Sequence, residues 1–279
     1  MVNPVSQNMR AASQTPAADA PILIFDSGVG GLSVLDAVRA ELPGAPLIYA
    51  ADTAGLPYGN KSEAEIAARV AGLLGRMSER YRPRLACIAC NTASTIALGM
   101  VRDVLHIPIV GTVPAIKPAA ALTKTGIIGL IGTEATIRQA YVDKLESEFA
   151  SGATLLRLAA PDLVAAAEAK LRAQPVDRAA ITRAADDLTM LASGNRIDVL
   201  VLACTHFPLL SAELQEAFGP DVTLVDGAAG IARRIASLTQ GQEFARSEPD
   251  RAVFTDGDAG LEALTPALNQ RGIDKIVVL

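Results

Sequence analysis

Short apolar runs that alternate with amphipathic segments limit most strongly what this chain can fold into. Strand-like runs rich in Ile, Val and Leu lie at 21–27, 45–52, 84–90, 107–112, 125–133, 153–161, 197–205 and 222–227. Helical patterns lie between them, among others at 62–80, 134–149, 162–173 and 177–194. Apolar strands separated by helices are typical of parallel sheets that are covered on both faces. The sequence therefore predicts an α/β fold with mainly parallel sheets.

The order of these runs also repeats weakly along the chain. "IIGLIGT" is similar to "ILIFDSG", "LVLACTHFP" to "CIACNTAS", and "VTLVDGAAG" to "IPIVGTVPA". Cys90 and Cys204 stand at matching places, 114 residues apart. Chance similarity between strands rich in Ala and Val is the alternative. We favour two pseudo-symmetric units, 21–113 with 225–279 and 114–224, that meet at the carboxyl ends of their strands, where open parallel sheets bind ligands.

The totals exclude several classes of protein. Half of the 279 residues are apolar and the formal net charge is −5. We expect no nucleic-acid partner, because neutralising phosphates needs an excess of Lys and Arg. Residues 1–20 lack the apolar core of a signal peptide and are interpreted as a flexible tail, and no uncharged run is apolar enough to span a membrane. Three cysteines in such a chain predict free thiols and a cytoplasmic location.

The glycine-rich stretch "FDSGVGGLS" at 25–33 has two interpretations. A phosphate-binding turn is one, with Asp52 near the place of a ribose-binding acid. Ser33 stands where that pattern needs Gly or Ala, no Walker lysine follows, and the Asp26 carboxylate would face a pyrophosphate. We favour the second interpretation, in which Asp26 and Ser27 offer a carboxylate and a hydroxyl at the end of a strand.

A zinc site is the second alternative, with Cys87, Cys90, Cys204 and His206 as ligands. Cys87 and Cys90 fall within one predicted strand, where residues three apart point to opposite faces. Zinc-binding pairs with this spacing usually occupy tight turns, and redox pairs open a helix. We therefore expect no metal, and we interpret Cys87 as a small buried hydrophobic residue.

The third interpretation pairs Cys90 with Cys204. Each cysteine ends an apolar strand and precedes polar residues that can form hydrogen bonds. Two thiols that face one pocket suit the removal of a proton from one face of a carbon and its delivery to the other face. One must be a thiolate and the other a thiol, so each needs an acid/base partner. His206 is suited to that role beside Cys204, whereas His106 is interpreted as structural.

The motifs "FDSGVGG", "YAADTAGLPYG", "ACNTAS" and "ACTHFP", in this order, resemble those of the glutamate racemase family. The resemblance extends from about Pro21 to Leu238, most of the chain. It implies two α/β domains with the active site between them, and racemisation of glutamate without a cofactor. It also implies a supply of D-glutamate for peptidoglycan synthesis, and it allows for a homodimer.

The resemblance also implies catalytic roles for particular residues. Cys90 matches the base that removes the α-proton of D-glutamate, and Cys204 matches the base that acts on L-glutamate. Asp26 matches the group that assists the first thiol, and His206 the group that assists the second. The segment "APDLVAAAEAK" makes Glu168 the second acidic helper.

Substrate-binding residues are implied at the strand ends: Asp26, Ser27, Tyr58, Gly59, Asn91, Thr92, Thr133, Thr136, Thr205 and His206. The chain departs from the family at Ala203 and Phe207, where Gly and Tyr are usual, and at the small residues 165–167.

Because the α-proton is weakly acidic and no pyridoxal lysine motif is evident, the pocket must stabilise a carbanion-like transition state with preorganised donors.

Two other functions remain open from the sequence. One is racemisation of aspartate or a hydantoin within the same superfamily, which the "CTH" triplet at 204–206 disfavours, since the aspartate enzymes carry Glu after Cys-Thr. The other is ligand binding by an α/β protein without catalysis.

Overall fold

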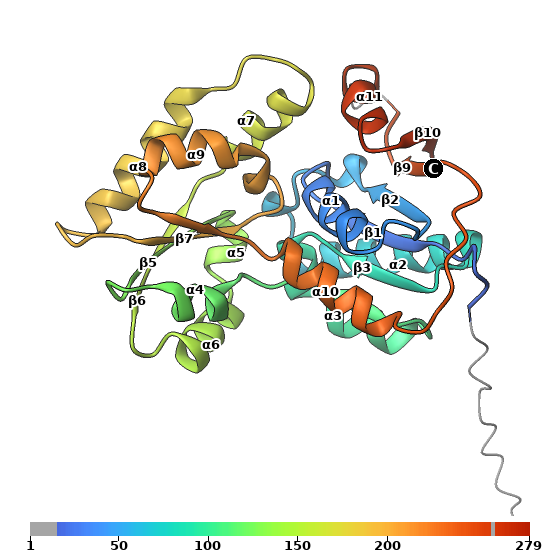
Figure 1. Ribbon diagram of the computed structural model, residues 1–279, viewed down its shortest axis with the longest axis horizontal. Helices are drawn as coiled ribbons and strands as arrows, with labels where there is room; N and C mark the ends of the chain where they lie inside the picture. Colours follow the sequence, from blue (N-terminus) through green and yellow to red (C-terminus); the bar gives the residue numbers. More distant parts are fainter. Residues whose placement is uncertain (1–15, 258–259) are drawn as a thin grey trace, which may run out of the picture.

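The computed structural model describes residues 16–257 and 260–279, which form two lobes (Figure 1). Residues 1–15 of the predicted tail lie outside the described residues. The following residues pack on the first lobe, because Arg84 donates hydrogen bonds to the carbonyl oxygens of Ala17, Ala18 and Ala20. No helix in the described part is long and apolar enough to cross a membrane.

The first lobe is built on a parallel sheet with strand order β10-β9-β2-β1-β3-β4. Its strands are β1 (Ile22–Asp26), β2 (Leu47–Ala51), β3 (Leu85–Ile88), β4 (Ile109–Gly111), β9 (Asp250–Phe254) and β10 (Ile273–Val278). Apolar side chains of α1 (Leu32–Glu41), α10 (Ala228–Leu238) and α11 (Leu261–Asn269) pack on one face. Those of α2 (Glu63–Tyr81) and α3 (Asn91–Val104) pack on the other.

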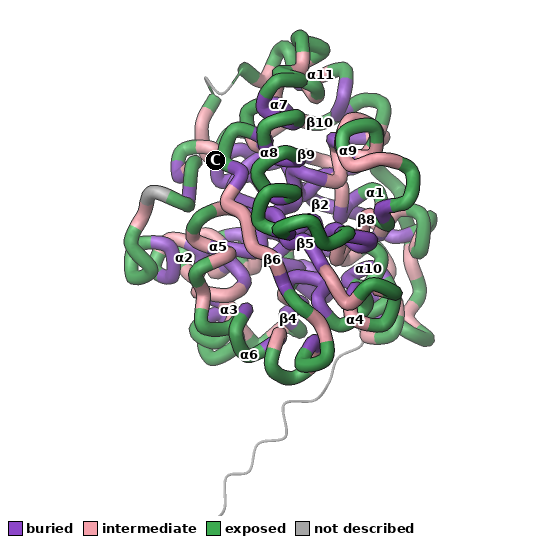
Figure 2. Tube along the Cα trace, turned by 90° about the vertical axis from the view of Figure 1, so that its left-hand side faces the viewer, coloured by how far each residue is buried: buried purple, intermediate pink, exposed green. Residues whose placement is uncertain are grey.

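The second lobe is built on a parallel sheet with strand order β6-β5-β7-β8. Its strands are β5 (Ile127–Gly132), β6 (Thr154–Ala159), β7 (Val199–Ala203) and β8 (Thr223–Val225). One face packs against α7 (Asp162–Leu171), α8 (Arg178–Leu191), the short helix η3 (Phe207–Leu210) and α9 (Ser211–Phe218). The other packs against α4 (Ile116–Leu122) and α6 (Ala140–Phe149), with α5 (Glu134–Ile137) beside the strand ends. The central strands of both sheets are buried, and the outer faces of the helices are exposed (Figure 2).

The strand order of the second lobe repeats that of β2-β1-β3-β4 in the first. This shared order confirms the α/β fold and agrees with the repeat seen in the sequence. The chain passes between the lobes after β4 and again after β8, and the two crossings are adjacent. A Cβ atom added to Gly227 would lie 3.2 Å from Thr112 Oγ1. The predicted domain limits, 113/114 and 224/225, stay predictions.

Helix α2 forms where the sequence pattern predicts a helix. Ser62 caps this helix by accepting a hydrogen bond of 3.2 Å from the Glu65 N–H. Ile66, Val70 and Leu74 form a buried stripe at helical spacing. Elsewhere the prediction differed from the structure: the segment 134–149 forms α5 and α6 rather than one helix, and β9 and β10 were not predicted.

Candidate active site

A cavity lies between the lobes at the carboxyl ends of β1, β3, β5 and β7, and it encloses about 60 Å³. A cavity of this size admits only a small molecule. It is lined by both cysteines of the predicted pair and by residues of both lobes: Ser27, Leu56, Pro57, Tyr58, Gly59, Cys90, Asn91, Thr92, Thr133, Thr136, Val164, Ala203, Cys204, Thr205 and His206.

Cys90 lies at the amino end of α3, on the wall that the first lobe contributes. We predicted it within a strand, which was wrong: β3 ends at Ile88, and Cys90 caps the helix that follows. Its sulfur accepts the Ala93 N–H at 3.5 Å and lies 3.4 Å from Ser27 Oγ. Burial and the nearby Asp26 charge raise the pKa of the Cys90 thiol to about 12, against the opposing effect of these bonds. Cys90 is therefore a neutral thiol at physiological pH.

Asp26, which we predicted as the group that assists Cys90, lies in the first lobe beside the cavity. It is fully buried at the end of β1, and the hydrogen bonds to its carboxylate come from the Gly28 N–H at 2.7 Å and Thr205 Oγ1 at 3.0 Å. Burial raises the pKa of Asp26, while the His206 charge and these two bonds act in the opposite direction. We predicted Asp26 as a substrate contact as well, but it is not among the residues that line the cavity.

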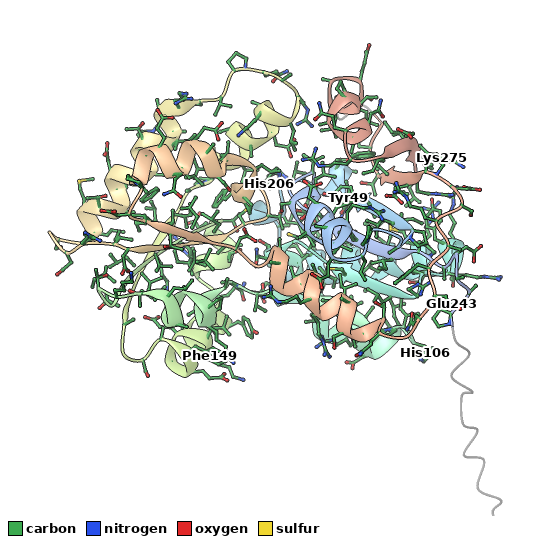
Figure 3. The ribbon with its side chains drawn as sticks, in the orientation of Figure 1. Tyr49, His106, Phe149, His206, Glu243 and Lys275 are labelled. Atoms are coloured by element: carbon green, nitrogen blue, oxygen red, sulfur yellow. The ribbon has the colours of Figure 1, made fainter. Side chains whose placement is uncertain are left out.

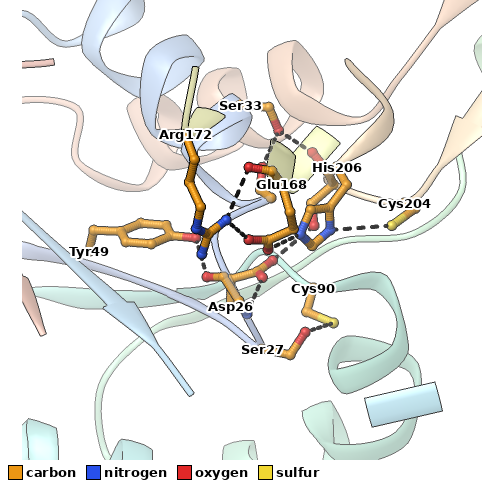
Figure 4. A network of polar contacts seen from close by, with 12 residues as sticks. Asp26, Ser27, Ser33, Tyr49, Cys90, Glu168, Arg172, Cys204 and His206 are labelled. Carbon is orange, nitrogen blue, oxygen red and sulfur yellow. Dashed lines mark hydrogen bonds and ion pairs between the residues drawn. The ribbon is translucent and has the colours of Figure 1, made fainter. Parts of the chain in front are cut away.

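Cys204, on the opposite wall, has an acid/base chain behind it (Figure 4). Its sulfur lies 3.7 Å from His206 Nδ1, and His206 Nε2 lies 2.9 Å from Glu168 Oε1. The other carboxylate oxygen of Glu168 pairs with Arg172. Burial opposes charge on His206, but the bonds to Cys204 and Glu168 prevail and raise its pKa to about 10. Burial likewise opposes the Glu168 charge, yet His206 and Arg172 lower the pKa of Glu168. At neutral pH, Cys204 therefore faces an imidazolium that is held by a carboxylate.

Three threonines form the polar wall near the first thiol. Thr92 Oγ1 lies 3.3 Å from the hydroxyl oxygens of both Thr133 and Thr136. Thr133 caps α5, since its hydroxyl oxygen accepts the Thr136 N–H at 3.2 Å. This cluster joins α3 of the first lobe to α5 of the second.

Tyr58 forms another part of the wall and is held from outside the cavity. Its hydroxyl donates to Asp52 Oδ2 at 2.6 Å. The buried Asp52 carboxylate also pairs with Arg69 and accepts the Thr255 hydroxyl at 2.7 Å. The loop that carries Tyr58 and Gly59 is therefore fixed to α2 and to the end of β9.

Direct contacts hold the two lobes together beside the cavity. Ser33 Oγ in the first lobe donates to the Thr205 carbonyl oxygen at 3.0 Å, and Thr205 Oγ1 donates in return to Asp26. Gly30 lies against the second lobe so closely that an added Cβ atom would fall 2.5 Å from His206 Nδ1 and 2.6 Å from Thr205 Oγ1. The structure thus shows the lobes closed over the cavity.

Comparison with known proteins shows which family this chain belongs to. Residues 32–235 match the family model described as Asp/Glu/hydantoin racemase. The chain is 64% identical over 244 residues to a glutamate racemase of Sphingopyxis alaskensis, across 87% of this chain and 91% of the relative. The chain belongs to the Asp/Glu/hydantoin racemase family.

A second relative in this racemase family, a glutamate racemase of Escherichia coli, is 41% identical over 278 residues, 98% of this chain and 97% of the relative. A crystal structure of the Escherichia coli enzyme in complex with L-glutamate and the activator UDP-MurNAc-Ala superimposes with a TM-score of 0.88. At 41% identity it covers 93% of this chain and 98% of the solved one. The two-lobed racemase fold predicted from the sequence is confirmed.

The structure brings the predicted site residues of this racemase together. The cavity wall includes both thiols and the predicted substrate-binding residues apart from Asp26, while Glu168 stands behind His206. The sequence did not identify Ser33 as a contact between the lobes. It also did not identify Arg69 and Arg172 as the ion-pair partners of Asp52 and Glu168. The spacing of Arg172, four residues after Glu168 on a helical pattern, was a signal for an ion pair.

Two of the interpretations considered from the sequence, a zinc site that includes Cys87 and a phosphate-binding turn, do not match the geometry of this site. Cys87 packs with α1 and α10, on the face opposite to Cys90, which is the arrangement expected of a core residue. The described part of the chain holds no cluster of three or more His, Cys, Asp or Glu side chains suited to a metal ion. The glycine-rich turn packs against His206, so the space a pyrophosphate would need is filled. His106 is exposed and distant from His206 (Figure 3).

Proposed function

We propose that this protein interconverts L-glutamate and D-glutamate, with Cys90 and Cys204 as the two acid/base groups. The observation that carries the proposal is the position of these thiols, which come from different lobes and line one small cavity. Relatives at 64% and 41% identity are named glutamate racemases, which supports glutamate as the substrate. The reaction would supply D-glutamate for peptidoglycan synthesis and would take place in the cytoplasm. A homodimer stays a prediction.

The two walls differ in charge, and this assigns the first steps of the reaction. The imidazolium of His206 stabilises a thiolate at Cys204, while Cys90 holds its proton. From L-glutamate, the Cys204 thiolate takes the α-proton, and the Cys90 thiol donates its own proton to the opposite face of the carbon. From D-glutamate the same two steps run in reverse, starting from a Cys90 thiolate and a Cys204 thiol, which is the state that one turnover of L-glutamate leaves. After the product is released, one proton returns from Cys204 to Cys90 through solvent before the next molecule of L-glutamate reacts. Neither direction consumes a proton overall.

The polar wall supplies groups for the rest of the substrate. The side-chain oxygen of Asn91 is buried at the cavity and has no hydrogen-bond partner within the described residues, so it is suited to accept a bond from the substrate ammonium. The hydroxyl of Thr92 is suited to donate to a substrate carboxylate, whereas the hydroxyl of Thr205 already donates to Asp26. Donors already in place stabilise the developing carbanion, and the closed lobes keep water away.

The proposal is tested by incubating the protein with L-glutamate in deuterated water without added cofactor. We expect loss of optical rotation together with deuterium at the α-carbon. Cys90→Ser and Cys204→Ser should each abolish racemisation. Cys87→Ala is the matched control, since it removes a buried thiol outside the cavity, and it should retain activity.

If neither enantiomer of glutamate exchanged its α-proton, glutamate racemisation would be refuted. Exchange with aspartate or a hydantoin alone would assign the protein to another reaction of the same family. Near-normal turnover in either serine variant would refute the two-thiol mechanism while leaving the substrate assignment in place.

A further inference from the structure

The carboxyl end of α7, a helix of the second lobe, is in contact with the first lobe. Leu171, the last residue of the helix, packs against the apolar core between the first sheet and α1, α10 and α11. The next residue, Arg172, lies beside the turn before α11, where a Cβ atom added to Gly260 would be 3.4 Å from Arg172 Nε. The end of α7 is therefore a contact between the lobes, formed away from the crossings at Thr112 and Gly227.

Arg172 joins this contact to the acid/base chain of Cys204. Its Nη1 donates to the Glu168 carboxylate and, at 3.1 Å, to the Glu168 carbonyl oxygen. Glu168 uses its two carboxylate oxygens separately, one for Arg172 and the other for His206. The side chains of Arg172 and Glu168 are each 17% exposed, so solvent screens the pair much less than a surface ion pair.

The geometry of this pair limits how Glu168 can turn. A carboxylate held by the guanidinium on one oxygen presents its other oxygen in a fixed direction, which is toward His206 Nε2. Without that restraint Glu168 can rotate into the wider hollow of about 640 Å³ outside the cavity, which it lines together with Arg172. His206 would then lose the anion that keeps its ring oriented and charged.

We propose that Arg172 is a positioning residue, which holds the Glu168 carboxylate against His206 and ties it to the first lobe. The acid/base chain behind Cys204 is then complete when α7 is docked on the first lobe. This inference rests on the proposed function, because its readout is the transfer of the glutamate α-proton. It predicts an effect on proton transfer at Cys204 only, because none of the hydrogen bonds described above joins Cys90 to Glu168 or Arg172.

Primary isotope effects distinguish the two proton transfers. The equilibrium constant between enantiomers is one, so a variant must lose the same factor in kcat/KM with L-glutamate and D-glutamate. Slower transfer at Cys204 increases the isotope effect with α-deuterated L-glutamate, because that step breaks the C–D bond. The same change decreases the isotope effect with α-deuterated D-glutamate, whose C–D bond is broken at Cys90.

The test compares wild-type protein with Arg172→Gln, Arg172→Lys and Arg271→Gln. For Arg172→Gln we expect a loss of kcat/KM of about 10- to 100-fold, the size of effect that a small misplacement near the chemistry produces. The isotope effect should rise with L-glutamate and fall with D-glutamate. Arg172→Lys, which keeps the charge, should lie between wild type and Arg172→Gln in both measurements. Arg271, with 18% side-chain exposure and an ion pair to Asp36, is the matched control, and its variant should keep wild-type kinetics.

Three results would overturn the inference without affecting the proposed function. One is wild-type kcat/KM in Arg172→Gln. Another is a higher KM for both enantiomers with unchanged isotope effects, which would mean that Arg172 binds the substrate directly. The third is an isotope effect that rises with D-glutamate, which would place Arg172 behind Cys90. Failure of the wild-type protein to racemise glutamate would instead refute the proposed function itself.

Discussion

Gly30→Ala is a small substitution that the closed structure predicts to be strongly damaging to activity. Gly30 lies in the turn between β1 and α1, and its Cα faces the second lobe. The added methyl carbon would fall 2.5 Å from His206 Nδ1 and 2.7 Å from the His206 backbone nitrogen. The side chain of His206 could turn aside, but its backbone nitrogen can move only with the second lobe.

The structure sets the size of the displacement. The backbone nitrogen must move from 2.7 Å to at least 3.4 Å, the ordinary contact distance, which is a shift of 3.4 − 2.7 = 0.7 Å. A displacement of about 1 Å at a reacting group is enough to slow a reaction by about 100-fold. We therefore expect kcat/KM for glutamate to fall by roughly 100-fold, which corresponds to about 2.7 kcal/mol in the barrier.

The assay is steady-state racemisation of both enantiomers, with circular dichroism to confirm that the variant is folded. Gly72→Ala is the matched control. Gly72 lies on the exposed face of α2, and an added Cβ atom there would meet no heavy atom within 4 Å. This control should keep its activity and gain about 1 kcal/mol in free energy of unfolding, because Ala favours a helix over Gly. A folded Gly30→Ala protein with activity near that of Gly72→Ala would refute the requirement for this close contact.

Three further predictions follow from the charges of the site and of its supporting network. Since His206 must be protonated beside Cys204 and its pKa is raised to about 10, kcat/KM should stay level from neutral pH upward and fall as the pH passes about 10; a fall near pH 7 would contradict this. Asp52→Asn should release Tyr58 and raise KM more than it lowers kcat, whereas an unchanged KM would show that Asp52 does not position the loop. Arg69 and hydrogen bonds lower the pKa of Asp52 despite its burial, so the Asp52 carboxylate stabilises the fold above its unfolded pKa of about 4. The difference in free energy of unfolding between wild type and Asp52→Asn, measured by denaturant titration, should therefore shrink as the pH falls from about 4 through the lowered pKa.

Much of the fold could be predicted because its central strands are buried on both faces. Such strands have to be continuously apolar, so β1, β3, β5 and β7 were visible as runs of Ile, Leu and Val. The edge strand β10 was not recognised, because half of its residues are exposed and the charged pair Asp274 and Lys275 interrupts its apolar run. Cys90 was placed in a strand for a related reason: it continues the apolar run, while the turn into α3 depends on tertiary packing.

The site was predictable where function is carried by residue type at a strand end. Both thiols, His206 and the threonines stand in short motifs that follow apolar runs. Asp52, Arg69 and Arg172 could not be placed in the same way. Asp52 and Arg69 act through partners in other elements, and their charges give no signal in the sequence that these partners lie near the cavity. The spacing of Arg172 from Glu168 indicated the ion pair, but the contact of Arg172 with the first lobe depends on tertiary packing.

The isotopic composition of both enantiomers at low conversion tests the two-thiol mechanism most directly. Protiated L-glutamate is incubated with the protein in deuterated water, and the enantiomers are separated before a tenth of the substrate has reacted. Two thiols on opposite walls predict D-glutamate that carries deuterium at the α-carbon and recovered L-glutamate that remains protiated. Protium retained in the D-glutamate, or deuterium in both enantiomers from the start, would show that a single group moves the proton and would contradict the roles of Cys90 and Cys204.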